Sequence, residues 1–306
     1  MGAIIFSPPR PSLAGSFVAF LLVGAGVGGS ACRPAPAGPA VISLVDDSGD
    51  TVRLTAAAKR VVSLIPATTE LLFAIGAGSA VVGRTSYCDY PAAAGDVPDV
   101  GDGIRPNIEA VLARSPDLVV LYNSGQNAAV AGRLSELGIA ALRVNTDDLS
   151  SVPRVAGILG RLTGRERAAD SLAAVFDTAL TSATRSRAAG RPRVLLLVWE
   201  QPPMTIGRGS FLNELLERAG GQNLFADVAA SSGVVSIEAV AARNPDLIFI
   251  TADGPSAFAG RPEWQVVPAV RERRFLRVHG SEFSRPSPRS PQAIRRLTAQ
   301  LDGRHR

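Results

Sequence analysis

The chain has 306 residues and two cysteines, 46% of it is apolar and 19% is charged. This composition excludes a disulfide-dense scaffold, a collagen-like repeat and a disordered chain, and the length suffices for one or two globular domains. The net charge is +5, but the basic residues are dispersed without an aromatic stripe, which argues against nucleic acid as a partner. With two histidines and no CxxC pair, the sequence favours neither a resident metal site nor a bound cofactor.

The amino-terminal segment has the layout of a secretory signal. A short apolar run at residues 13–27 ends in four small residues before Cys32, so residues 1–31 are predicted to be a signal peptide. Because the run is shorter than the ~20 residues that cross a bilayer, we expect no transmembrane helix in the mature protein. Small residues before a cysteine resemble the lipobox of bacterial lipoproteins. We therefore expect lipidation of Cys32, with ordinary signal cleavage at the same bond as the alternative, and a Pro-rich tether over 32–40.

After the tether, short apolar runs alternate with helical patterns. A hairpin is predicted over residues 41–54, because alternating apolar residues flank Asp47-Ser48-Gly49. The predicted strands and helices then follow at 61–65, 70–75, 118–122, 128–137 and 142–144, and again at 194–198, 211–219, 247–251, 264–270, 275–278 and 294–301. This alternation predicts an α/β fold with two Rossmann-like lobes, residues 41–163 and 191–306, each with a mainly parallel sheet.

A single helix is predicted to join the lobes. Apolar residues recur at three- and four-residue steps from Ala168 to Ala183, and no Gly or Pro occurs between Glu166 and Ala189. We place the connecting helix at 164–190, with about 24 residues in one run and a length of some 36 Å. One rigid crossover favours small closing movements over wide hinge motion.

The chain contains an internal repeat. IEAVLARSPDL at residues 108–118 matches IEAVAARNPDL at 237–247 in nine of eleven positions. Each copy follows a helix N-cap residue, Asn107 or Ser236, and leads through Pro-Asp into an apolar strand. The repeat predicts that the lobes share a substructure about a pseudo-two-fold axis, with Glu109 and Glu238 in equivalent places. Either glutamate alone could merely complement a helix dipole, whereas the pair suits a two-fold symmetric partner that carries basic residues.

Several motifs, in order along the chain, resemble one known family. RVVSLIPATTELLFAIG (60–76), TSYCDYP (85–91), PNIEAVLARSPDLVV (106–120) and RPSPR (285–289) are similar to landmarks of the substrate-binding proteins of ABC importers for cobalamin, haem and ferric siderophores, and are closest to the cobalamin-binding branch. The resemblance covers roughly residues 41–301. It implies two lobes on a helical backbone, and a monomer in the periplasm or on the outer face of the cytoplasmic membrane. It also implies a partnership with an ABC permease dimer and its ATPase subunits, docked through Glu109 and Glu238.

The expected ligand cleft follows from the fold, because ligands of open α/β lobes bind beyond the carboxyl ends of the strands. Aromatic faces there would pack a large flat or amphipathic ligand, and polar groups would fix its edges, which suits a cobalt corrinoid, a haem or an iron chelate. The candidate ligand-binding residues are Pro66, Ala67, Thr68, Tyr87, Tyr122, Trp199, Met204, Glu282, Phe283 and Arg285. For each aromatic residue, packing in the core is the alternative.

Two further function classes stay open. An exported two-lobed hydrolase or chelatase-like enzyme would need catalytic residues, but the chain has no GxSxG motif and no phosphate-binding GxxxxGK[ST] motif. One of the two histidines, His305, lies in the terminal tail and only His279 remains inside the fold, so we predict no catalytic residues and no enzyme activity. A structural or adhesive lipoprotein is the other class, and it predicts no tight small ligand. Cys88 is expected to be a buried small thiol rather than a ligand to cobalt or iron.

Overall fold

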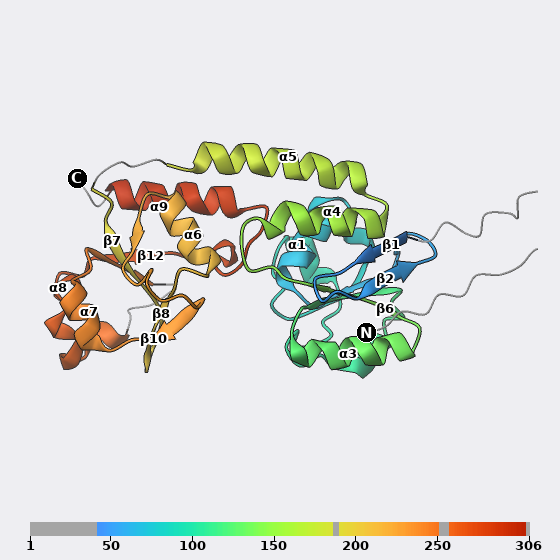
Figure 1. Ribbon diagram of the computed structural model, residues 1–306, viewed down its shortest axis with the longest axis horizontal. Coiled ribbons are helices and arrows are strands. Elements are labelled where there is room, and N and C mark those ends of the chain that lie inside the picture. The colour runs from blue at the N-terminus through green and yellow to red at the C-terminus, as the bar shows by residue number, and fades with distance from the viewer. Residues whose placement is uncertain (1–41, 186–189, 251–256, 304–306) are drawn as a thin grey trace, which may run out of the picture. The chain divides into compact units, whose positions relative to one another are not determined.

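The computed structural model describes residues 42–185, 190–250 and 257–303 of the chain. These residues all belong to one compact unit, and Figure 1 shows them as a coloured ribbon. The predicted signal peptide and tether, with Cys32, lie outside the described residues.

The N-terminal lobe opens with the predicted hairpin. Strands β1 (Ile42–Val45) and β2 (Thr51–Leu54) pair antiparallel. The turn between them is closed by the Asp46 carboxylate, which accepts backbone N–H groups of Ser48 at 2.9 Å and Asp50 at 3.1 Å. Aspartate side chains commonly accept the backbone N–H two residues further on, and this explains why the chain turns here.

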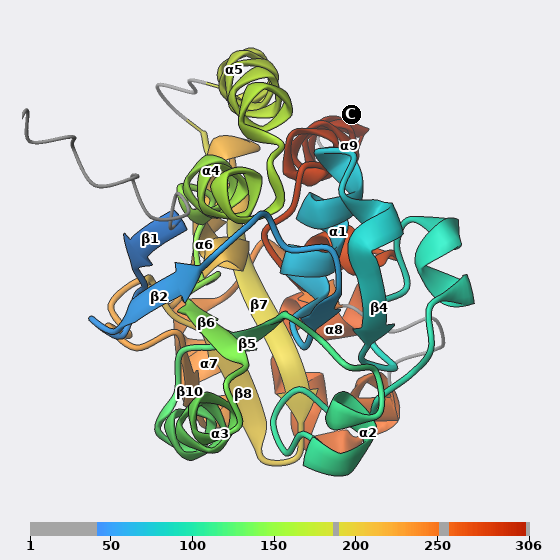
Figure 2. The same cartoon turned by 90° about the vertical axis from the view of Figure 1, so that its right-hand side faces the viewer.

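A four-stranded parallel sheet forms the body of this lobe, in the order β4-β3-β5-β6. Its strands are β3 (Val61–Ser63), β4 (Val81–Arg84), β5 (Leu118–Tyr122) and β6 (Ala140–Val144), and its helices are α1 (Pro66–Ala74), α2 (Ile108–Leu112) and α3 (Gly125–Glu136). Figure 2 shows α1 on one side of the sheet and α2 with α3 on the other. Strand β4 had no counterpart among the predicted elements.

Two helices, rather than one, lead out of this lobe. Helix α4 (Ser151–Thr163) ends at Gly164, whose φ of 66° suits glycine, and α5 (Glu166–Ala183) follows at once. Helix α5 has 18 residues, about 27 Å at 1.5 Å per residue, and packs against α4 and α9 (Ser290–Gly303) (Figure 1). The prediction of one helix over 164–190 is therefore too long. The helix ends early because the backbone turns extended at Thr184 and the N–H of Arg185 bonds instead to the carbonyl of Arg218, at 2.8 Å.

The C-terminal lobe has a mixed sheet in the order β10-β8-β7-β11-β12, with β9 paired to β7. Strands β7 (Arg193–Glu200), β11 (Leu247–Ile250) and β12 (Phe275–Arg277) run parallel, as predicted. The short strand β9 (Gln222–Asn223), also parallel to β7, was not predicted. The antiparallel extension of β8 (Pro203–Ile206) and β10 (Ser232–Val234) was not predicted. The remaining helices are α6 (Phe211–Arg218), α7 (Ile237–Arg243) and α8 (Pro268–Arg271).

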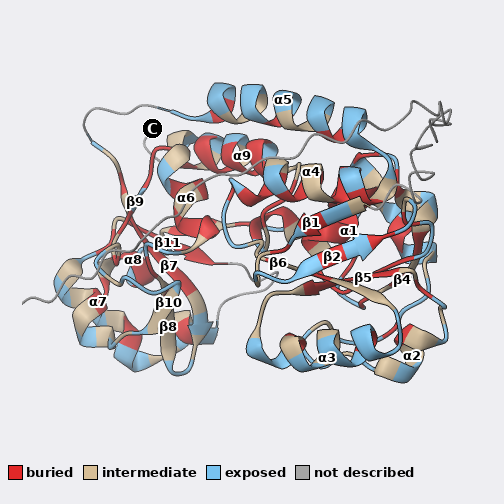
Figure 3. Cartoon of the chain, turned by 45° about the vertical axis from the view of Figure 1, so that its right-hand side comes forward, coloured by how far each residue is buried: buried red, intermediate tan, exposed pale blue. Residues whose placement is uncertain are grey.

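The central parallel strands of both sheets are buried on both faces, as expected for parallel strands that helices cover on both sides. On β5, Leu118 and Val120 belong to one apolar cluster, while Val119 and Leu121 belong to another, which follows the two-residue period of a strand. The larger cluster is continuous from the N-terminal sheet through α4 and α5 to α6, α9 and the C-terminal sheet. Figure 3 shows these strands as buried and the outer side of α5 as exposed. The two lobes therefore share one apolar core, which is continuous through helices α4, α5, α6 and α9.

Candidate ligand-binding site

The repeated segments fold alike. The Asn107 side chain accepts the N–H of Ala110 at 3.1 Å, and the Ser236 hydroxyl accepts the N–H of Ala239 at the same distance. These caps satisfy free N–H groups at the starts of α2 and α7. Glu109 and Glu238 lie in the first turns that the caps hold, and both side chains are exposed. Hydrogen bonds from its own backbone N–H and from Ser236 hold the pKa of Glu238 below its ordinary value.

In each lobe, hydrogen bonds of an aspartate and an arginine hold the turn after the repeated helix. Asp117 accepts the N–H groups of Lys59 at 2.8 Å and Arg60 at 3.1 Å, while Asp246 accepts the N–H of Arg193 at 2.7 Å. The Arg60 side chain in turn donates to the carbonyl of Ser115 at 2.8 Å. Arg193 does the same in the other lobe, where its guanidinium donates to the carbonyls that end α7 at 3.0 and 2.8 Å. These bonds attach the end of α2 to the start of β3 and the end of α7 to the start of β7.

Both lobes line a cavity with a volume of about 920 Å³. The N-terminal lobe contributes Tyr122 from the end of β5, and Thr146 and Asp147 from the loop after β6. The other lining residues come from β7, β8, the start of α6, the residue before β10 and the segment after β12. They are Val198, Ile206, Gly209, Ser210, Phe211, Leu212, Ser231, Val278, Gly280, Ser281, Phe283, Ser284, Arg285 and Pro286. The walls therefore combine apolar side chains with hydroxyl groups.

A smaller cavity of about 470 Å³ adjoins it. The two share Thr146, Ser281, Ser284 and Arg285, so these four residues form the boundary between them. The smaller cavity is otherwise lined by the start of α1 and the loop after β4, through Ile65, Pro66, Ala67, Ser86, Tyr87 and Asp89.

Two carboxylates in these walls, Asp147 and Asp89, form hydrogen bonds with neighbouring side chains. The Tyr122 hydroxyl donates to Asp147 at 2.7 Å, and burial, this hydrogen bond and the negative charge of Asp147 raise the pKa of Tyr122 to about 12. The phenol therefore stays protonated and acts as a hydrogen-bond donor. Burial by itself raises the pKa of Asp89, but the hydrogen bond and charge of Arg285 outweigh it and hold that pKa below its ordinary value.

The structure brings six of the ten predicted ligand-binding residues to these cavities. Tyr122, Phe283 and Arg285 line the larger one, and Pro66, Ala67, Tyr87 and again Arg285 line the smaller. Four do not line either cavity. They are Thr68, Trp199, Met204 and Glu282.

Burial explains two of these corrections. Thr68 is 0% exposed, and its hydroxyl donates to the Ile65 carbonyl at 2.9 Å within the first turn of α1. Glu282 is 7% exposed and pairs with Arg289 and Arg296. Both residues are therefore part of the internal structure rather than of a cavity wall.

Trp199 and Met204 lie opposite each other on β7 and β8. Trp199 is 61% exposed, and its indole N–H donates to the Gln201 carbonyl at 2.9 Å. The pair forms an exposed apolar strip with Val234 of β10, which is paired with Met204. The strand end was predicted correctly, but the antiparallel extension carries these side chains away from the lining of either cavity.

Several lining residues were missed. Thr146 and Asp147 follow β6, where the same rule about strand ends would have found them. Ser210 is the N-cap of α6, with its hydroxyl 3.3 Å from the N–H of Leu212, so the predicted helix start at 211 pointed to it. Ser281 and Ser284 carry no local signal. Cys88 is buried beside the hydroxyls of Thr69 and Thr85, at 3.1 and 3.3 Å, which confirms the expected buried thiol.

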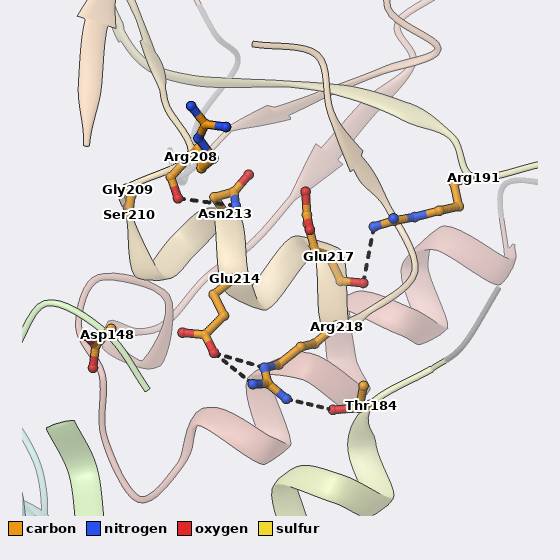
Figure 4. A pocket seen from close by; sticks show the side chains of 10 residues that line it. All are labelled: Asp148, Thr184, Arg191, Arg208, Gly209, Ser210, Asn213, Glu214, Glu217 and Arg218. Atoms are coloured by element: carbon orange, nitrogen blue, oxygen red, sulfur yellow. Dashed lines mark hydrogen bonds and ion pairs between the residues drawn. The ribbon is translucent and has the colours of Figure 1, made fainter. Parts of the chain in front are cut away.

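A third pocket, of about 550 Å³, lies where the crossover meets the C-terminal lobe (Figure 4). Two of its charged side chains, Glu214 and Arg218, pair with each other. Glu214 accepts two hydrogen bonds from Arg218, at 2.9 and 3.0 Å, and one from the N–H of Leu149 at 3.1 Å, while Arg218 also reaches Thr184 at 3.3 Å. These bonds tie α6 to the start of α4 and the end of α5, so this pocket belongs to the junction of the lobes.

Two observations of the described ranges bear on the ligand and the membrane. Across residues 42–185, 190–250 and 257–303, no three His, Cys, Asp or Glu side chains are grouped so that they could hold a metal ion. Over the same residues, no helix combines the length and the hydrophobicity that crossing a membrane requires.

The model of the periplasmic binding protein family matches residues 61–281, which include both repeated segments and most of the residues that line the two cavities. The chain belongs to this family. It is 30% identical to an uncharacterized ABC transporter substrate-binding lipoprotein, YvrC, of Bacillus subtilis, over 85% of each chain. It is 32% identical to the vitamin B12-binding protein of Salmonella paratyphi A, over 80% of this chain and 91% of that protein.

Solved structures agree with this assignment. The fold matches the periplasmic heme-binding protein RhuT from Roseiflexus sp. RS-1 with a TM-score of 0.71 and 25% identity, over 82% of this chain and all of that one. The resemblance stated from the sequence is thereby confirmed at the level of the family, and the chain is a substrate-binding protein of the ABC importer type. The α/β fold with two lobes is confirmed as well.

Proposed function

We propose that the cavity of about 920 Å³ binds a corrinoid of the cobalamin type between the two lobes. Its volume lies within the range of small-molecule sites, and both lobes supply its walls. Apolar groups such as Phe211 and Phe283 would pack the faces of a large ring system, while Tyr122 and the serine hydroxyls would hold its polar edge. The vitamin B12-binding relatives support the corrinoid, and the heme-binding neighbour keeps haem, with ferric siderophores, as the alternative.

Delivery follows from the paired glutamates. Glu109 and Glu238 are exposed on equivalent first turns, which suits arginines on the two halves of an ABC permease dimer with its ATPase subunits. The protein captures ligand, closes slightly and releases the ligand when the permease separates the lobes. We further infer that it works as a non-catalytic monomer outside the cytoplasm, anchored through lipidated Cys32.

The function is tested by titrating the protein with cyanocobalamin, haem and a ferric hydroxamate while following calorimetric heat. We expect tight one-to-one binding of cyanocobalamin. Phe211→Ala removes packing surface from the cavity wall and should weaken binding about tenfold or more. Val175→Ala shortens an apolar side chain on the exposed side of α5 and should leave affinity unchanged. Tight binding of haem alone would select the alternative cargo.

If none of the three ligands gives detectable binding, the result would contradict the corrinoid proposal. The enzyme alternative makes a different prediction, namely turnover of esters or insertion of metal into porphyrins that is lost in His279→Ala. Such turnover would contradict the non-catalytic function.

A further inference from the structure

A buried ionic cluster joins the two lobes beside the cavities. Glu70 lies on α1 of the N-terminal lobe, and its side chain is 1% exposed. Its carboxylate accepts hydrogen bonds from Arg285 Nε at 2.7 Å, Arg289 Nη2 at 2.8 Å and Arg289 Nε at 2.9 Å. The two arginines come from the segment after β12, more than 200 residues later in the chain. Three directional bonds therefore meet at one carboxylate from the opposite lobe.

The C-terminal lobe holds the donors in place. Arg289 Nη1 donates to Glu282 at 2.9 Å, and the other carboxylate oxygen of Glu282 accepts from Arg296 of α9. Burial by itself lowers the pKa of Arg289, but hydrogen bonding to Glu70 and the charges of Glu70 and Glu282 raise it above its ordinary value. Glu282 thus helps to hold the charged guanidinium of Arg289 in the orientation in which it contacts Glu70.

The N-terminal lobe supplies two further contacts, from the loop after β4. Arg289 lies 4.0 Å from the centre of the Tyr90 ring, a cation–π contact, and Arg285 pairs with Asp89. Three carboxylates and three guanidinium groups alternate through the cluster, so its charges balance.

Arg285 connects this cluster to the ligand cavities. It lines both of them, with Ser281 and Ser284 of the same segment, so the segment that Glu70 holds is also the boundary wall. A shift of α1 relative to this segment would change the width of both cavities. Buried ion pairs add little net stability, because desolvation offsets attraction, but their directional bonds can fix one arrangement.

We propose that Glu70 is a positioning residue, and that the ionic clamp it forms with Arg285 and Arg289 sets the separation of the two lobes at the ligand cavity. The inference rests on the proposed function for its effect on ligand affinity. The lobe separation itself can be measured without any ligand.

The first experiment measures that separation in the full chain. Spin labels are attached to cysteines introduced at two exposed positions, Ala129→Cys on α3 and Ala242→Cys on α7. Cys32→Ser removes one native thiol, and the other, Cys88, is buried. Electron double resonance should give one narrow distance distribution for this parent and a longer, broader one for its Glu70→Gln derivative. An unchanged distribution in the derivative would overturn the clamp.

The second experiment measures cyanocobalamin binding kinetics. Glu70→Gln should weaken affinity about tenfold, mainly through faster dissociation, because Glu70 does not line either cavity. A broader distance distribution with unaltered affinity would overturn the role in positioning the cavity. If the unsubstituted protein binds neither cyanocobalamin nor haem nor a ferric hydroxamate, the proposed function fails, while the distance measurement still decides the clamp.

Two further variants separate the clamp from general effects. Arg289→Lys keeps the charge but loses the planar fork, so it should reproduce both effects in milder form even if Glu70→Gln does not fold. Glu136→Gln makes the same chemical change in an exposed pair with Arg133 on α3, and should alter neither distance nor affinity. Equal effects from Glu136→Gln would assign the result to net charge and overturn the clamp.

Discussion

The two copies of the repeat differ in what surrounds them rather than in how they are built. Ser115 and Asn244, at equivalent positions, share a φ of 45°, and each is followed by a buried proline and an aspartate that bonds to a neighbouring strand. Their outer supports are not shared. Arg243 forms two bonds with Asp227, at 2.6 and 2.7 Å, whereas the Nε of its counterpart Arg114 is buried without a hydrogen-bond partner.

This difference shows which part of the repeat is tied to a common task. The cap, the turn and the aspartate together place one exposed glutamate in each lobe, and these features are the same in both copies. The contacts beyond the helix ends adapt to each lobe, and α7 is longer than α2 by two residues. Four predictions test whether the shared part acts symmetrically and whether the unshared part matters.

The largest effect is expected at the glutamates. Glu109→Ala and Glu238→Ala should each weaken docking to the cognate permease in membrane vesicles about tenfold, and the double variant about a hundredfold, because separated charge pairs contribute independently. Ligand binding should not change, and Glu136→Ala, an exposed glutamate of α3, is the matched control. A single variant that abolishes docking alone would break the symmetry between the lobes. Normal transport by the double variant would contradict the docking roles.

The aspartates after the helices come next. Asp117→Ala leaves the N–H groups of Lys59 and Arg60 without their acceptor, and Asp246→Ala does the same to Arg193. Each should lower the free energy of unfolding by about 1–3 kcal/mol, measured by urea denaturation, with the larger loss at Asp117 because it accepts more backbone bonds. Equal losses would mean that the side chain of Arg193, which lies 3.5 Å from Asp246, compensates for the difference.

How far the sequence leads can be judged from particular residues. Most of the parallel strands, several helix starts and the repeat were predictable because each rests on local signals, such as alternation, caps and the Pro-Asp turn, whereas strand β4 was missed. Tyr122, Phe283 and Arg285 were placed by the rule that ligands bind at strand ends. Thr68 and Glu282 were misassigned because their burial depends on partners that no local pattern reveals. The ionic clamp was invisible for the same reason, since Glu70 and its arginines are more than 200 residues apart.

The positive-φ residues of the repeat, Ser115 and Asn244, give a smaller, opposite effect. Serine is strained at a φ of 45°, whereas asparagine tolerates the left-handed region. Ser115→Gly should therefore raise the free energy of unfolding by up to about 1 kcal/mol, while Asn244→Gly should change it little. Urea denaturation of both variants beside the parent measures the contrast. Equal stabilisation at the two positions would show that asparagine gains nothing from its side chain here.

The smallest effect concerns the support that only the C-terminal lobe has. Hydrogen bonds from Arg243 lower the pKa of Asp227 to about 2, below the usual value of about 3.9 in an unfolded chain. Because the folded-state pKa is the lower one, the pair stabilises the protein above pH of about 4, and this contribution is lost as the pH falls through about 2. Arg243 also lies 4.2 Å from the centre of the Phe225 ring, so Asp227→Asn, which keeps that contact, is the cleaner variant. Thermal melting of this variant and the parent should differ at pH 6 and converge toward pH 2. A difference that persists at pH 2 would mean that the ion pair is not its source.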